Sequence, residues 1–143
     1  MKINSILSTK GREVITSVPE ETLTDAIRRL VLHNIGSLVV TGDEGEIIGI
    51  LSERDIIRAL TVSREALSLP IKNVMSRIVI LAEPNDDVMS VANTMTEKRF
   101  RHMPIVEKGK LVGIVSIGDI LKAQRDQYKG EIETLETQIM ADD

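Results

Sequence analysis

The chain has 143 residues and a formal net charge of −4, with two histidines, no cysteine and 1% aromatic residues. The lack of cysteine excludes a disulfide framework and thiolate metal sites, and two histidines argue against a catalytic zinc centre, so no metal site is expected. The scarcity of aromatic side chains argues against nucleic-acid binding, because single strands stack on such side chains. Apolar runs are too short to span a membrane and no signal-peptide core follows Met1, so we expect a cytoplasmic protein.

The first half is predicted to contain a strand, a helix, a hairpin of two strands and a second helix. Short runs rich in β-branched residues predict the strands, and apolar residues recurring every three or four positions predict the helices. The elements follow an apolar lead-in at residues 3–7 and are predicted at residues 14–18, 20–33, 37–40, 47–51 and 52–60.

The second half repeats this order. Pro19 corresponds to Pro84 and Leu23 to Val88, both at an offset of 65 residues. Units of about 55–60 residues bury too little surface to fold alone, so two β-α-β-β-α repeats are expected to pack sheet against sheet as a pseudo-two-fold α+β pair. The second lead-in is predicted at residues 71–75, with strands at 78–81, 103–106 and 111–115 and helices from 84 and 117. The predicted domains are residues 1–68 and 69–125, followed by an acidic C-terminal helix or tail at 126–143.

The C-terminal stretch differs from the body in charge and pattern. Residues 126–143 hold six acids and one base, a local charge of −5, whereas the rest of the chain carries +1. Tyr128, Ile132, Leu135 and Ile139 are spaced four, three and four, which is a coiled-coil alternation, although Gly130 is expected to interrupt the helix. Two interpretations stay open: a helix that folds back on its own body, or a short dimer contact.

One strand-to-helix junction occurs twice, as Gly-Ile-Leu-Ser-Glu-Arg-Asp at residues 49–55 and Gly-Ile-Val-Ser-Ile-Gly-Asp at residues 113–119. A serine followed three residues later by a carboxylate is close to a capping box, so both pairs could simply cap helices. Alternatively, the free amides of a helix N-terminus form an anion site, and the carboxylate accepts hydrogen bonds from the vicinal hydroxyls of a ribose.

A phosphate on such a ligand would need basic partners. The densest basic run is Lys98-Arg99-Phe100-Arg101-His102, directly before the strand at 103–106, and we take Arg101 and His102 as phosphate candidates. The alternative is that these bases only complement the negative end of a helix dipole. Lys10 and Arg54 are further basic positions of the same kind, for which a plain surface charge is the preferred interpretation.

The duplicated Gly-Ile-Leu-Ser-Glu-Arg-Asp-Ile and Gly-Ile-Val-Ser-Ile-Gly-Asp-Ile, with Arg-His-Met-Pro-Ile-Val before the second copy, resemble the cystathionine-β-synthase (CBS) domain. Two copies form a CBS pair, or Bateman module, and the likeness covers about residues 1–125. More narrowly, the chain resembles small stand-alone bacterial CBS-pair proteins. The resemblance implies binding of AMP, ADP, ATP, NAD(H) or S-adenosylmethionine in clefts between the repeats, without a catalytic cofactor.

The resemblance also implies the ligand-binding residues. The ribose carboxylates would be Asp55 and Asp119, with a serine before each and an isoleucine flanking the base. Each cleft would borrow residues from the opposite repeat, and the lead-in loop would close over the ligand. The residues for the Asp119 cleft are Asp119, Ser116, Ile114, Arg101, His102, Ile35, Gly36, Lys10 and Gly11. Those for the Asp55 cleft are Asp55, Ser52, Ile50, Arg54, Phe100 and Arg101.

The first repeat has Ser37-Leu38-Val39-Val40 where the second has His102-Met103-Pro104-Ile105, so the two clefts should differ and the Asp119 cleft should suit a phosphate better. The leading functional hypothesis is a non-catalytic nucleotide sensor, expected to form a homodimer and to act on a downstream protein that the sequence does not identify. The alternative is a homodimeric interaction scaffold with degenerate clefts. An enzyme ranks third because the chain has no P-loop, nucleophile elbow, zinc-protease motif or cysteine nucleophile.

Overall fold

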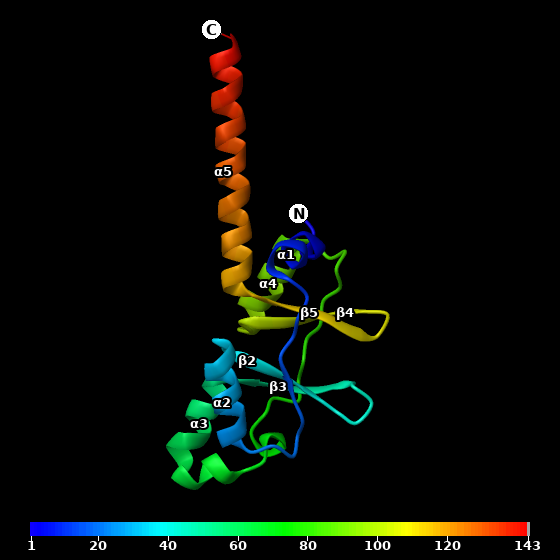
Figure 1. Ribbon diagram of the computed structural model, residues 1–143, viewed down its shortest axis with the longest axis vertical. Coiled ribbons are helices and arrows are strands. Elements are labelled where there is room, and N and C mark those ends of the chain that lie inside the picture. The colour runs from blue at the N-terminus through cyan, green and yellow to red at the C-terminus, as the bar shows by residue number, and fades with distance from the viewer. Residues whose placement is uncertain (143) are drawn as a thin grey trace.

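The computed structural model describes residues 1–142, which form the two expected repeats and a long C-terminal helix (Figure 1). Helix α1 comes first, and two short 3-10 helices, η1 and η2, join the repeats. The first repeat contains β1 (Thr16–Ser17), α2 (Leu23–His33), β2 (Ser37–Thr41), β3 (Ile47–Ser52) and α3 (Glu53–Val62). The second contains α4 (Val88–Lys98), β4 (His102–Glu107), β5 (Lys110–Ser116) and α5 (Ile117–Asp142). The lead-in and linking helices are α1 (Ile3–Lys10), η1 (Arg64–Ser68) and η2 (Ile71–Asn73).

Each repeat is built on an antiparallel hairpin. In the first, β2 pairs with β3 and also runs parallel to β1, so the sheet order is β1-β2-β3. In the second, β4 pairs with β5 through a turn at Lys108 and Gly109, whose φ angles of 52° and 76° are those of a type I′ hairpin turn. Figure 1 shows the two hairpins stacked in the middle of the molecule, with α2 and α3 beyond the first and α1 and α4 beyond the second.

Successive side chains of β2 and β3 point to opposite faces of the first sheet, and both faces are buried. Leu38 and Leu51, opposite one another, belong to the core beneath α2 and α3. Val39 and Ile50 are also buried, but they lie outside that core because successive side chains of a strand point to opposite faces. These two side chains therefore point toward the second repeat, as expected for sheet-to-sheet packing.

The prediction of a strand at residues 78–81 is wrong. Those residues form no strand, and the only sheet-like pairing here is a single parallel bridge between Ala82 and Ile105. Two backbone hydrogen bonds carry it, from Ala82 N–H to Pro104 O (3.1 Å) and from Val106 N–H to Ala82 O (2.8 Å). The counterpart in the first repeat, β1, has two residues, so the strand predicted at residues 14–18 is also shorter than expected.

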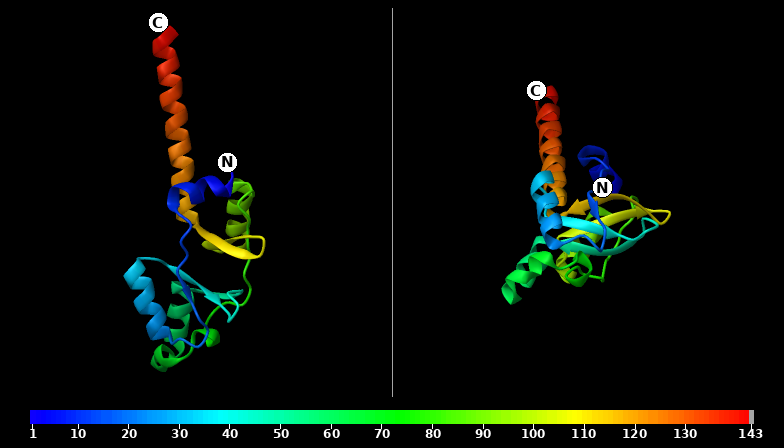
Figure 2. Two further views of the ribbon diagram at one scale, coloured as in Figure 1. Left: turned by 45° about the vertical axis from the view of Figure 1, so that its right-hand side comes forward. Right: turned by 60° about the horizontal axis from the view of Figure 1, so that its bottom comes forward.

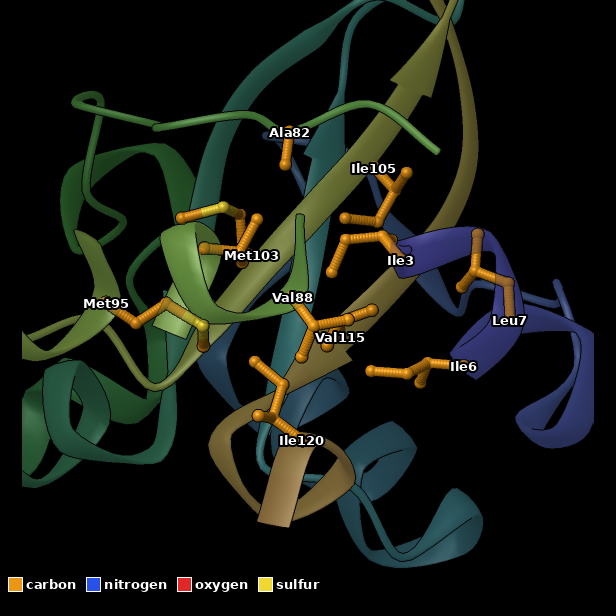
Figure 3. Packing of buried hydrophobic residues seen from close by; sticks show 11 residues of the cluster. Ile3, Ile6, Leu7, Ala82, Val88, Met95, Met103, Ile105, Val115 and Ile120 are labelled. Carbon is orange, nitrogen blue, oxygen red and sulfur yellow. The ribbon is translucent and has the colours of Figure 1, made fainter. Parts of the chain in front are cut away.

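The lead-in segments are exchanged between the two cores. Helix α1 packs through Ile3, Ile6 and Leu7 into the core of the second repeat (Figure 3), whereas Ile71 and Met75 pack into the core of the first. A Cβ added to Gly113 would lie 2.6 Å from a Leu7 methyl, so glycine is what lets α1 approach β5 this closely. The domain boundaries 1–68 and 69–125 stay a prediction. In space, the core of each repeat takes its lead-in segment from the other half of the chain.

The C-terminal helix does not fold back. Helix α5 is continuous from Ile117 to Asp142 and passes through Gly130 without a break, so the expected interruption does not occur. In Figures 1 and 2 it extends far beyond the rest of the molecule. Leu135 keeps 58% of its surface exposed and Tyr128 keeps 64%, so neither side chain is buried against the rest of the described residues. Residue 143, the end of the predicted tail, lies outside the described residues.

Candidate functional site

Both predicted carboxylates cap their helices. In the first repeat Asp55 Oδ2 accepts from the Ser52 N–H (3.0 Å), and Ser52 Oγ accepts from the Asp55 N–H (3.2 Å). In the second the same pair of bonds joins Ser116 and Asp119, at 2.8 and 3.0 Å. The capping interpretation of the duplicated junction is therefore right for both copies. A role in ligand binding also requires a carboxylate oxygen that no other group of the protein binds, with open space beside it.

Asp119 meets both requirements. Its Oδ2 carries the capping bond, while Oδ1 has no hydrogen-bond partner within residues 1–142. The carboxylate borders a cavity of about 320 Å³ that both repeats line. Seven of the residues predicted for this cleft line it: Lys10, Ile35, Gly36, His102, Ile114, Ser116 and Asp119.

The elements explain why residues so distant in sequence meet here. Ile35 and Gly36 follow the end of α2, where Asn34 adopts φ 52° and turns the chain toward the second repeat. A Cβ on Gly36 would lie 2.7 Å from Glu53 Oε1 and 3.4 Å from His102 Cε1, so a larger residue here would require the end of the Glu53 side chain to move. The first repeat thus forms one wall of the cavity, and β4, β5 and the start of α5 form the other.

Other predicted residues lie elsewhere. Arg101 and Gly11 are exposed and do not line the cavity beside Asp119. The Arg101 carbonyl accepts from the backbone N–H of Ile117 (3.0 Å). The equivalent bond in the first repeat runs from the backbone N–H of Glu53 to the Gly36 carbonyl (3.0 Å). The residues predicted for the other cleft also lie outside this cavity: Ile50, Ser52, Arg54, Asp55 and Phe100.

The sequence analysis missed part of the cavity wall. Glu13, Val14 and Ile15 line it, because the chain between α1 and β1 runs past the cavity before the strand begins. The prediction had assigned residues 14 and 15 to a strand. The preceding Gly11, with φ 104°, is the local signal that the chain changes direction here before it enters the strand.

The charges at the site shift two pKa values. Burial alone would raise the pKa of Asp119, but hydrogen bonds from Lys10 and from the Ser116 N–H outweigh it and hold the pKa below its ordinary value. Burial lowers the pKa of His102, and the positive charge of Lys10 lowers it further, against the opposing pull of Glu53 and Asp119. In the free protein the site therefore holds an ionised carboxylate beside a histidine that resists protonation.

The His102 shift predicts a pH-dependent stability. Since its folded-state pKa is depressed, its contribution is complete above the unfolded value of about 6.5 and is lost as the pH falls through that value toward the folded one. We expect the free energy of unfolding, measured by urea titration, to fall between pH 7.5 and 5.5, and to fall less in the His102→Asn variant. The exposed His33→Asn is the control and should keep the wild-type slope. Identical slopes in all three proteins would contradict the prediction.

Fold and site together define a pair of ligand-binding repeats. The CBS domain family matches residues 6–62 and 71–126, so the chain belongs to that family and carries two copies of the domain. A CBS pair is a ligand-binding regulatory module, and the two repeats with α5 account for residues 1–142 without a catalytic domain. Among those residues no helix has the length and apolar character to cross a bilayer.

Similar proteins come from distant organisms. The CBS domain-containing protein YhcV of Bacillus subtilis is 30% identical over 118 residues, which is 82% of this chain and 84% of that protein. The mitochondrial CBS domain-containing protein CBSX3 of Arabidopsis thaliana is 30% identical over an alignment of 146 positions, which covers 96% of this chain and 71% of that protein.

Solved structures agree with the fold. The CBS-domain containing protein ATU1752 of Agrobacterium tumefaciens superposes with a TM-score of 0.84 at 35% identity, covering 86% of this chain and 92% of that one. The CBS domain pair of protein MJ0100, solved in complex with 5′-methylthioadenosine and S-adenosyl-L-methionine, has a TM-score of 0.79 at 27% identity and covers 89% and 98%.

Proposed function

We propose that this CBS pair is a non-catalytic sensor that binds an adenosine-containing ligand in the cavity beside Asp119. The observation that carries the proposal is the free Oδ1 of Asp119 on a cavity lined by both repeats. That oxygen is suited to accept from a ribose hydroxyl, and Ile35 and Ile114 offer apolar surface to the base. The adenosyl ligands of MJ0100 support this ligand class. The candidates are AMP, ADP, ATP or NAD(H), with S-adenosylmethionine also possible.

Binding would act by bridging the repeats. Because the cavity has one wall from each repeat, a ligand contacts both and favours the relative position in which both sets of contacts form. The output is then a change of geometry that a downstream protein recognises. We expect the protein to act in the cytoplasm, although the Arabidopsis relative is a mitochondrial protein.

A thermal-shift panel of these ligands tests the proposal. A ligand at 100 times its dissociation constant should stabilise the protein by about 2.7 kcal/mol and raise its melting temperature. Asp119→Ala should abolish the shift, whereas Asp25→Ala, which removes the equivalent capping carboxylate of α2, should preserve it. No shift with any ligand, or an unchanged shift in Asp119→Ala, would contradict the site.

A homodimer is the second part of the proposal, and the exposed apolar stripe of α5 supports it. Tyr128, Ile132, Leu135 and Ile139 lie on one side of the projecting part of α5, and each of them is exposed. Their spacing is that of a coiled-coil seam, which a second copy would bury. If the panel gives no shift and the protein is dimeric, the interaction scaffold becomes the preferred function.

A further inference from the structure

Lys10, the last residue of α1, forms an ion pair with Asp119, the carboxylate on which ligand binding is proposed to depend. Lys10 Nζ donates to Asp119 Oδ2 at 2.5 Å and to the carbonyl of Ile114 at 2.7 Å. Both side chains of the ion pair are partly exposed, at 34% and 24%. The ammonium therefore stands at the edge of the site, where a ligand can reach it.

Lys10 also stands between two open spaces. It borders the cavity of about 320 Å³ between the repeats and a second cavity of about 490 Å³ between α1 and α5, and Asp119 borders both as well. Both helices line the second cavity, with polar side chains such as Ser5 and Asp126 beside apolar ones such as Ile6 and Ala123. A lysine has a flexible four-carbon stem, so its ammonium can move between these spaces while α1 stays in place.

We propose that Lys10 is a built-in counter-ion of Asp119 which a ligand displaces, and that the displaced ammonium then binds the anionic group of that ligand. The inference rests on the proposed function and adds a selection rule to it, namely a preference for ligands that carry an anionic group at the 5′ position. The two vicinal hydroxyls of a ribose can bind both oxygens of the carboxylate, but Oδ2 already accepts from Lys10. A ligand bound in this way must break a charge-assisted hydrogen bond, which is stronger than a neutral one. A phosphate gives the ammonium a new partner, whereas an uncharged or sulfonium group at the 5′ position leaves it without one.

The surroundings of Lys10 fit this role. Leu7, one turn earlier on α1, is fully buried against the second repeat, so the backbone that carries Lys10 is held firmly. His102 lines the same cavity, and the positive charge of Lys10 contributes to the lowering of the His102 pKa, so the two side chains face a common space. An anion there would meet both of them.

The first repeat has no such counter-ion. At the offset of 65 residues Lys10 corresponds to Met75, which is buried beside Gly49. In the second repeat the carbonyl of Ile114 accepts from the lysine ammonium. The corresponding residue of the first repeat, Ile50, instead pairs with the main chain of Ser76 through two hydrogen bonds of 3.0 and 2.9 Å. The selection for an anion should thus belong to the Asp119 side alone.

Isothermal titration of AMP and adenosine into wild type and Lys10→Met tests the selection. Loss of the ammonium should weaken AMP binding by about tenfold, equivalent to about 1.4 kcal/mol. Adenosine should bind more tightly to the variant, because nothing competes for Asp119. Lys10→Arg, which keeps the charge, should retain the preference for AMP. Lys110→Met removes an equal charge from an exposed site in β5 and should leave both affinities unchanged.

The outcomes separate the two proposals. If wild type binds neither AMP nor adenosine nor any other ligand of the thermal-shift panel, the proposed function fails. If wild type binds both and Lys10→Met changes the two affinities in the same direction, the selection rule alone is overturned. A ligand-free readout tests the ion pair itself: in NMR titrations Lys10→Met should raise the pKa of Asp119 and of His102, and unchanged pKa values would overturn the counter-ion role.

Discussion

Leu7→Ala should lower the free energy of unfolding by about 2–5 kcal/mol, the range for removing a buried leucine from a core. Leu7 is fully buried among residues of the second repeat and touches β5 at Gly113. Truncation leaves a cavity that α1 cannot fill by moving closer, because Ile3 and Ile6 already fix its position. Urea or guanidinium titration measures the loss.

The matched control is Leu32→Ala, the same truncation in helix α2, where the side chain is 79% exposed. It should change the free energy of unfolding by no more than about 0.5 kcal/mol. Equal small effects for both variants would mean that α1 is not part of the second core. Since α1 also carries Lys10, Leu7→Ala is expected to weaken the Lys10–Asp119 contact as well.

Leu135→Glu should convert the proposed dimer to a monomer. In the heptad assignment Leu135 and Tyr128 take d positions, and Ile132 and Ile139 take a positions. Burial of a leucine contributes about 1.5–3 kcal/mol, and a dimer loses two of them, so the dissociation constant should rise at least about 100-fold. A carboxylate in the apolar seam adds a desolvation cost. Light scattering after size-exclusion chromatography reads the oligomeric state.

Thr134→Glu is the control, because it adds the same charge to α5 one position away from the seam. Thr134 is exposed, and its hydroxyl bonds only to the Gly130 carbonyl of its own helix (2.9 Å). It should remain dimeric. A Leu135→Glu variant that stays dimeric would show that another surface joins the subunits, and a wild-type monomer would refute the homodimer.

The sequence predicted what is encoded locally. Serine and aspartate three residues apart give the helix caps at Ser52 and Ser116, and both form as expected. The duplicated pattern also predicted two repeats, and the match of the CBS family to both halves confirms it. Turn and cap signals depend on neighbouring residues, so a single chain is enough to detect them.

Long-range features were harder to predict. The run Ile78–Leu81 has the composition of a strand, yet it finds only a bridge at Ala82, since strand formation depends on a partner as well as on propensity. The Lys10–Asp119 pair joins residues 109 positions apart, and no local pattern encodes such a contact. The resemblance placed both residues at one cleft without indicating that they would bind each other.

The exchanged lead-ins have a consequence for synthesis on the ribosome. Helix α1 is made before the surface that receives it, which includes Val115 and Ile120, so its docking site is complete only after more than a hundred further residues have been added. At translation rates of about 5–20 residues per second, this delay is on the order of ten seconds. During that time the apolar side chains of Ile3, Ile6 and Leu7 lack the core that covers them in the folded protein.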